Sequence, residues 1–172
     1  EEVVAEDSDE IMLLRAVRNV AIHLRAGVTT MRDNGARNRV SFDLREGARR
    51  GYVASPRLLV SGRPITIAGG HFHFCGQEAD GESAVRAAVQ QLVEEGADHI
   101  KVMASGGGTA GTDPRHASYG MKELRAIAQE AHALGTRTTA HCVATASIAN
   151  AVDAGIDMIE HAVFLEPGGT VR

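Results

Sequence analysis

A lysine and two histidines stand at or near the ends of three strand-like segments. Lys101 lies in HIKVMAS, His141 in TRTTAHC and His161 in DMIEHA. If these segments are parallel strands separated by helices, the three side chains gather at one rim, since functional groups in such folds come from the carboxyl ends of strands. Imidazole nitrogens are common ligands of divalent metals. The pattern therefore predicts a metal site built from Lys101, His141 and His161.

The lysine is the unusual member of this trio. An ammonium group among Ile100, Val102 and Met103 is costly unless something pairs it or removes its charge. A lysine whose pKa is lowered by burial becomes partly neutral and nucleophilic. It can then react with carbon dioxide to form a carbamate, an anionic oxygen ligand that bridges two cations. We therefore expect Lys101 to be carboxylated when the metal site is filled.

The elements that must position these groups alternate regularly along the chain. Apolar spacing and stop signals predict helices over 8–26, 40–50, 82–95, 121–134 and 144–154. Runs rich in β-formers predict strands over 28–33, 57–61, 99–104, 137–142 and 158–161. This alternation indicates a parallel α/β sheet with right-handed crossovers. A full (β/α)₈ barrel typically needs ~250 residues, so the pattern alone leaves both an open sheet and an incomplete barrel as candidates.

Composition indicates one globular unit, and we treat residues 1–172 as a single segment. The chain has 172 residues, of which 44% are hydrophobic, and a formal net charge of −4. Neither a nucleic-acid-binding basic face nor a membrane-spanning apolar run is expected. The acidic start differs from a secretory signal, and the two cysteines, Cys75 and Cys142, give no disulfide framework. A cytoplasmic location is therefore predicted.

The other histidines are less informative. His71 and His73, in GGHFHFCG, share a face if the segment is a strand, so metal ligation, substrate binding and no role at all remain open. His23 and His132 fall within helical patterns and are expected to be exposed or capping residues. His99 can share a strand face with Lys101, and His116 lies in the loop after the same strand.

Five sequence blocks, taken together, resemble a known family. They are AGVTTMRDNG, SPRLLVSGRPITIAGGH, GADHIKVMASGGG, ELRAIAQEAHALGTRTTAHC and AVDAGIDMIEHA. They are similar to the metal-dependent amidohydrolase superfamily, and within it to the imidazolonepropionase-like and prolidase-like branch. The resemblance implies a distorted (β/α)₈ TIM-type barrel that hydrolyses C–N bonds with one or two divalent metals, most simply zinc. By this match, Lys101 looks like the strand-four lysine, His141 and His161 like the strand-five and strand-six ligands, and His71 and His73 like the substrate loop.

Two parts of the family pattern have no counterpart here. The first-strand His-x-His pair and the eighth-strand aspartate are both missing. We therefore expect an incomplete barrel of about five parallel strands, with strands one, seven and eight lacking. Exposed strand edges invite pairing with another chain, so a homo-oligomer is expected.

The expected function is metal-dependent hydrolysis by an activated hydroxide. The substrate class is a small amide, such as a dipeptide, an N-acyl amino acid, a urea or a carbamate. An alternative is an NAD-binding oxidoreductase, because the loop 106–111 satisfies G-x-G-x-x-G after a strand. The next predicted helix begins too late to place its N-terminus at a pyrophosphate. A non-catalytic barrel fragment is the third possibility.

Overall fold

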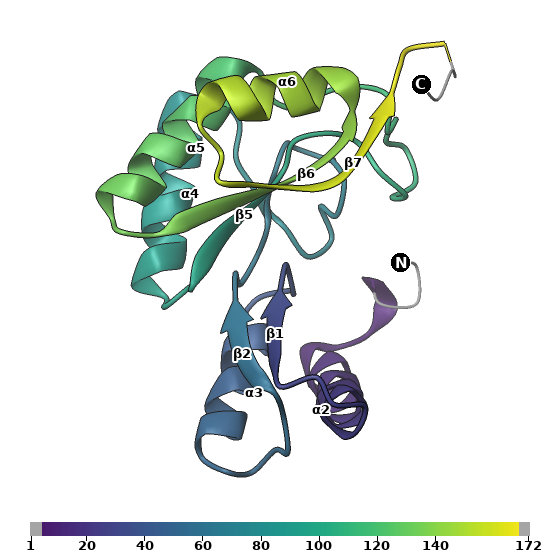
Figure 1. Cartoon of the computed structure of the whole chain (residues 1–172), viewed down its shortest axis with the longest axis vertical. Helices are drawn as coiled ribbons and strands as arrows, with labels where there is room; N and C mark the ends of the chain where they lie inside the picture. The colour runs from purple at the N-terminus through teal and green to yellow at the C-terminus, as the bar shows by residue number, and fades with distance from the viewer. Residues whose placement is uncertain (1–4, 169–172) are drawn as a thin grey trace.

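The computed structural model describes residues 5–168, in which helices and strands alternate (Figure 1). The helices are α2 (Asp9–Arg25), α3 (Val40–Arg49), α4 (Glu82–Glu94), α5 (Met121–Ala133) and α6 (Thr145–Ala154). The strands are β1 (Thr30–Asp33), β2 (Arg57–Val60), β3 (Ile65–Thr66), β4 (Gln77–Glu78), β5 (His99–Met103), β6 (Arg137–Ala144) and β7 (Met158–Leu165). Every predicted helix and strand is present. None of the helices described is both long enough and apolar enough to cross a membrane.

Local signals account for the bounds of helix α2. Ser8 Oγ accepts a hydrogen bond from the Ile11 backbone N–H at 3.3 Å, so Ser8 caps the helix. Asp9 and Glu10 place negative charge in the first turn, where the helix dipole favours it. Just beyond the last turn, Gly27 adopts φ +92°, a conformation that suits glycine and ends the helix.

The strands form two parallel sheets instead of the single sheet that the sequence led us to expect. β1 pairs with β2, and the larger sheet has the order β4-β3-β5-β6-β7. β3 and β4 lie in a segment expected to be loop. Asp98 links the sheets, because its backbone N–H donates to Val60 O and its carboxylate accepts from Val60 N, both at 2.8 Å. The start of β5 therefore lies beside the end of β2.

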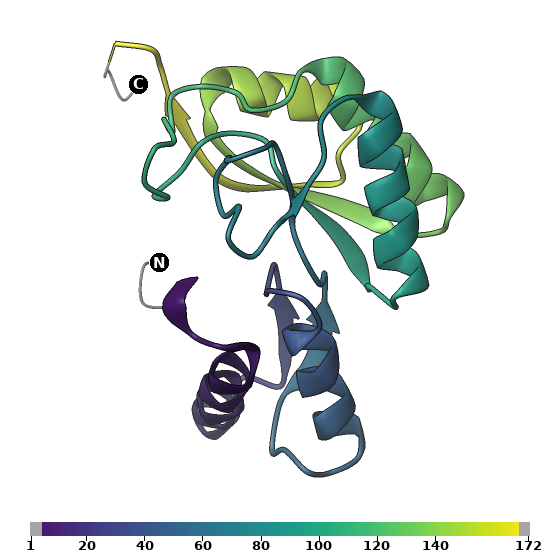
Figure 2. The ribbon, with the colours of Figure 1, turned by 180° about the vertical axis from the view of Figure 1, so that it is seen from behind.

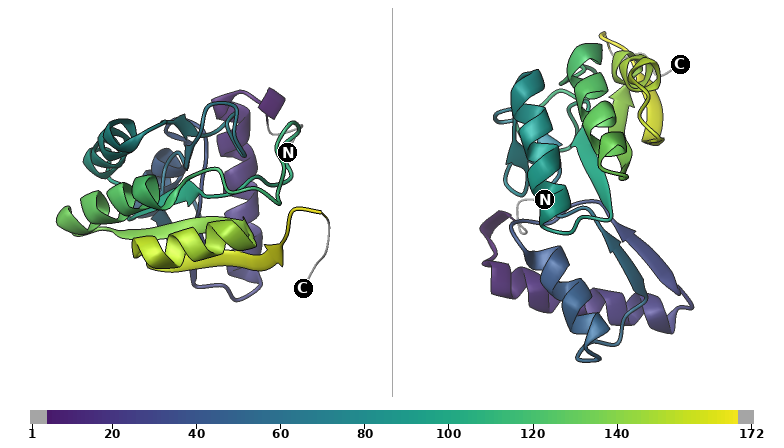
Figure 3. Two further views of the ribbon diagram at one scale, coloured as in Figure 1. Left: turned by 90° about the horizontal axis from the view of Figure 1, so that it is seen from above. Right: turned by 90° about the vertical axis from the view of Figure 1, so that its left-hand side faces the viewer.

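Helices α4, α5 and α6 lie side by side on one face of the larger sheet (Figures 1 and 3). The predicted apolar face of α4 (Val85, Ala88, Val89 and Leu92) is buried in this interface.

Strand β5 shows how this packing positions the site. It is buried along its whole length, and Ile100 and Val102 belong to the core beneath the helices. Because successive side chains of a strand point to opposite faces, His99 and Lys101 face away from those helices. We call this second face the inner face.

Candidate active site

Lys101 lies at the middle of β5 and is only 2% exposed. Its Nζ forms an ion pair with Glu160 Oε2 on β7, across the inner face of β6. Burial lowers the pKa of Lys101, while the hydrogen bond that it donates to Glu160 acts to raise it. The predicted burial of Lys101 is therefore confirmed. Its partner is Glu160, a carboxylate that the sequence did not indicate.

Glu160 is held by a second set of polar groups. Arg32 Nη2 donates to Glu160 Oε1 at 3.0 Å, and Asn34 Nδ2 donates to the same oxygen. Burial acts to raise the pKa of Glu160, but the hydrogen bond and charge of Lys101 hold it below its usual value. The carboxylate therefore stays ionised between two cationic side chains.

His99 joins this network through Asn34. The amide nitrogen of Asn34 donates to Glu160, so its Oδ1 is the acceptor for His99 Nε2–H at 2.8 Å. Burial, then the nearby charge of Arg32, lowers the pKa of His99 to about 4. The expectation that His99 shares a face with Lys101 is met, with a neutral imidazole that orients Asn34.

His141 lies near the end of β6 and is buried between two other imidazoles. Its ring centroid is 4.5 Å from that of His71 and 4.6 Å from that of His161. His141 Nε2 donates to Gly106 O at 3.0 Å. Burial lowers the pKa of His141 to about 4, which leaves the ring neutral at physiological pH. Such an imidazole keeps one nitrogen lone pair for a ligand.

A bulge in strand β7 places Glu160 and His161 on the same face of the sheet. Adjacent residues of a regular strand point to opposite faces, yet Glu160 contacts Lys101 and His161 contacts the ring of His141. His161 has φ 71° and Ala162 has φ 47°, and the β6–β7 register shifts here. Positive φ in non-glycine residues costs free energy and is concentrated at functional sites. The bulge therefore places a carboxylate and an imidazole on the inner face together. We call the group formed by Lys101, His141, Glu160 and His161 the inner cluster.

The structure separates the His71 and His73 pair. Both lie in turns after β3, not in a strand, so they do not share a strand face. His71 is buried beside His141, with Nδ1 2.8 Å from Thr109 Oγ1. His73 is exposed, and its Nδ1 lies 3.0 Å from Gly70 O. Only His71 reaches the inner cluster.

The glycine-rich loop after β5 has a packing role. A Cβ at Gly107 would lie 2.5 Å from His71 Nε2, and one at Gly106 would lie 2.2 Å from Asp113 O. Gly107 lets this loop lie against the loop after β3, which Figure 2 shows from behind, and Gly106 lets the loop fold closely on itself. The next helix, α5, begins only at Met121. The dinucleotide-binding interpretation of 106–111 therefore lacks its helix N-terminus.

A recess of about 320 Å³ opens between these two loops. His71 and Gly106 lie in its wall, together with His116, an exposed residue whose Nδ1 is 3.0 Å from Asp113 Oδ2. The recess thus adjoins the imidazole row through His71, whereas His161, at the other end of that row, is itself exposed. His23 and His132 are exposed on their helices, as expected, and His132 pairs with Asp157.

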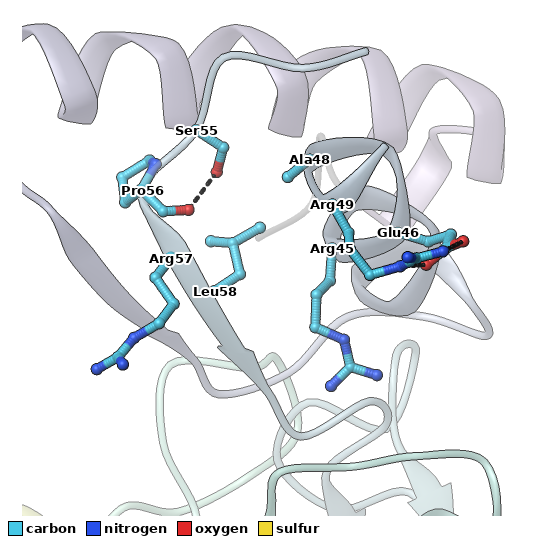
Figure 4. Close-up of a pocket in the computed structure, with 8 residues that line it drawn as sticks. All are labelled: Arg45, Glu46, Ala48, Arg49, Ser55, Pro56, Arg57 and Leu58. Carbon is cyan, nitrogen blue, oxygen red and sulfur yellow. Dashed lines mark hydrogen bonds and ion pairs between the residues drawn. The ribbon is translucent and has the colours of Figure 1, made fainter. Parts of the chain in front are cut away.

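A second cavity, of about 370 Å³, lies at the amino end of β2 (Figure 4). Arg45, Arg49 and Arg57 line it. Figure 4 shows their guanidinium groups pointing away from one another, and Arg49 pairs with Glu46 at 2.7 Å. The arginines do not converge on a common point, so this cavity is not an anion site.

The inner cluster offers donors that suit a divalent cation, although not a complete set. Within residues 5–168, no three His, Cys, Asp or Glu side chains are arranged to hold a metal ion. His141 is neutral and adjoins His161, which provides two imidazole donors. A third donor at this face is Lys101, which offers an anionic oxygen only after carboxylation. If Lys101 is carboxylated, the donor atoms of these three residues are of the kinds that bind a divalent metal.

Comparison with known proteins identifies the family of this chain. The model of the family described as "Amidohydrolase family" matches residues 7–170. Ochratoxinase from Aspergillus niger is 38% identical over 89 residues, which are 51% of this chain and 18% of that protein.

Two solved structures show the same architecture. A prolidase in complex with N-methylphosphonate-L-proline has a TM-score of 0.86 and 31% identity, over 95% of this chain and 44% of that one. A Xaa-Pro dipeptidase with methionine bound in its active site has a TM-score of 0.86 and 26% identity, over 94% and 43% of the two chains. The chain thus spans less than half of each of these relatives and corresponds to part of a barrel.

Proposed function

The chain belongs to the amidohydrolase family, and from this we propose that its protein hydrolyses an amide-type C–N bond. One observation carries the proposal: Lys101, at the middle of β5, shares the inner face with a row of three imidazoles from β6, β7 and the loop after β3. In that row His141 is level with the carboxyl end of β5. In barrels of this class, groups at that end of the strands perform the chemistry. Residues 1–172 then form one segment of a catalytic barrel.

The imidazoles of His141 and His161 would hold a divalent ion, with Lys101 as the third ligand once it is carboxylated. We propose zinc, as one or two ions, because imidazole and carboxylate-type oxygens suit it. When bound, the ion supplies an activated water at neutral pH and polarises the substrate carbonyl. The low pKa of His141 supports this role, because the ring does not need to lose a proton to bind a cation.

The chain's own residues would bind and orient the substrate. His71 is fixed between Thr109 and the ring of His141 and lies in the wall of the recess, so it is placed to orient a substrate there. The exposed His73 would contact the substrate outside the inner cluster. Glu160 holds Lys101 on the inner face until the lysine is modified.

The substrate class is a small amide: a dipeptide, an N-acyl amino acid, a urea or a carbamate. The printed names of the two structural relatives, a prolidase and a Xaa-Pro dipeptidase, favour a dipeptide among these. The recess of about 320 Å³ is of a size that suits a small molecule.

We also propose a cytoplasmic homo-oligomer. Cys75 and Cys142 are free and buried, as in proteins of a reducing compartment. β7 is at the end of its sheet, and Val163 and Phe164 on it are exposed, so this edge is open to further strands of a barrel or to a partner chain.

Metal analysis and turnover on the same preparation test the proposed function. Protein purified without added metal should contain a transition metal, and it should cleave X-Pro dipeptides or N-acyl amino acids. His141→Ala and His161→Ala should lose both metal and activity. His132→Ala, a change on the exposed surface of α5, should retain both. Metal-free protein that gains no activity when zinc, manganese or cobalt is supplied would contradict the proposal.

A further inference from the structure

Two successive threonines on β6 have opposite hydrogen-bonding states. Thr138 Oγ1 donates to Asp157 Oδ2 at 2.8 Å and accepts from Asp157 N at 3.1 Å. Thr139 Oγ1 is fully buried and has no hydrogen-bond partner within the described part of the chain. A buried hydroxyl without a partner costs free energy, so it calls for an explanation.

Thr139 lies directly beside Lys101. The two residues are partners in the parallel β5–β6 register, so their side chains lie on the same face, with the strands about 4.8 Å apart. His141 follows two residues later on that face. The Nζ of Lys101 is engaged by Glu160. The unpartnered hydroxyl therefore lies on the same face as the lysine and His141, and no group of the described residues accepts its hydrogen.

Carboxylation of Lys101 would supply the missing acceptor. In this step the neutral amine nitrogen forms a bond to the carbon of carbon dioxide, and the proton displaced from nitrogen passes to water. The side chain gains two acceptor oxygens and a negative charge. Because Glu160 is also negative, the ion pair seen here would be lost. The unmodified ammonium donates to Glu160, whereas the two oxygens of the carboxylated lysine need hydrogen-bond donors.

We propose that Thr139 is a positioning residue for the carboxylated form of Lys101, to which its Oγ1–H donates a hydrogen bond. The inference rests on the proposed function and extends it to a residue outside the ligand set. It explains why the hydroxyl is unpartnered beside an ammonium group. In the unmodified chain, the Thr139 hydroxyl already occupies the position from which it would donate to the carboxylated lysine.

Thr139→Val, which removes the hydroxyl and keeps the shape, tests the proposal on the whole protein. Incubation with ¹³C-bicarbonate and zinc should give a carbamate carbon signal in the wild type by NMR. In Thr139→Val we expect this signal to be lost and zinc to bind roughly 10-fold to 100-fold more weakly. Thr139→Ser should restore both. Metal-free Thr139→Val should melt no lower than the wild type, because the variant lacks the unpartnered hydroxyl.

The matched control is Thr138→Val. It should lower the melting temperature, since it removes the hydrogen bonds to Asp157, and should leave the carbamate signal intact. A Thr139→Val variant with a wild-type carbamate signal and zinc affinity would overturn the inference. So would one that melts well below the wild type without metal, because Thr139 would then be structural. A wild type that binds zinc without a carbamate signal would overturn the role of Lys101, and this inference with it.

Discussion

Lys101, which is buried, and Glu160, which is partly buried, form an ion pair across the inner face of β6, 59 positions apart in the chain. Their side chains are 3% and 16% exposed. The ammonium is removed from water and depends on Glu160 for its counter-charge, whereas the partly exposed carboxylate also has Arg32 and Asn34 as partners. The pair therefore joins β5 to β7 at the point where the candidate chemistry is located.

Glu160→Gln should destabilise the metal-free protein by about 3 kcal/mol, because it leaves a buried ammonium without its counter-charge. Lys101→Met alone should also destabilise it, because Glu160 then keeps only Arg32 and Asn34. The double variant should lose less than the sum of the single losses. Denaturant unfolding of the four proteins measures the coupling, and additive losses would show that the pair is not an energetic unit.

Gly107→Ala should displace His71, because the added Cβ would lie 2.5 Å from its Nε2. If His71 orients the substrate, a loss of kcat/KM on the order of 100-fold is expected. In a His71→Ala background, Gly107→Ala should add little. The control is Gly120→Ala, whose Cβ meets only Glu123, at 3.8 Å. If Gly107→Ala lowers kcat/KM equally in the wild type and in His71→Ala, its effect does not act through His71.

The stability of the metal-free protein should fall on acidification, because His99 and His141 are buried as neutral rings. Their folded-state pKa values are about 4, against 6.5 for an imidazole in an unfolded chain. Between these values the unfolded chain binds protons that the folded chain does not, so the free energy of unfolding decreases as the pH falls. Each histidine contributes at most about 3 kcal/mol.

Thermal unfolding across this pH interval measures the effect. His99→Gln, which retains a polar side chain beside Asn34, should remove roughly half of the slope. A melting temperature that does not change between neutral pH and the folded-state pKa would contradict the burial argument for both rings.

The sequence predicted helices α2 to α6 and the five longer strands, and it marked the buried lysine. The spacing of Val85, Ala88, Val89 and Leu92 predicted the buried face of α4, and that face is confirmed. A lysine within an apolar strand marked Lys101, and burial of this residue is confirmed. Apolar periodicity suffices in these cases because it reflects the packing of helices on a sheet.

The sequence missed Glu160 for a physical reason. A period of two places it opposite His161, and nothing in IEHA indicates the positive φ of His161 and Ala162 that reverses this. A buried cation needs a counter-charge, and that argument was the one available signal for an acidic partner. Asn34, which directly follows the predicted strand over 28–33, was not singled out as a site residue, although its amide bridges His99 and Glu160.

The split into two sheets was missed as well. The two-residue strands β3 and β4 are too short to produce a periodic pattern.

Asn34 provides the last prediction, since its amide donates to Glu160 and accepts from His99. Asn34→Asp keeps the acceptor for His99 but sets a second carboxylate against Glu160. At about pH 7.5 this repulsion should destabilise the protein by about 2 kcal/mol, more than Asn34→Ala does. At about pH 5 the raised pKa of the carboxylate pair allows one proton to be shared, so the deficit should shrink. Melting temperatures relative to wild type at both pH values measure this. A deficit that is the same at both would mean that the amide nitrogen of Asn34 does not face Glu160.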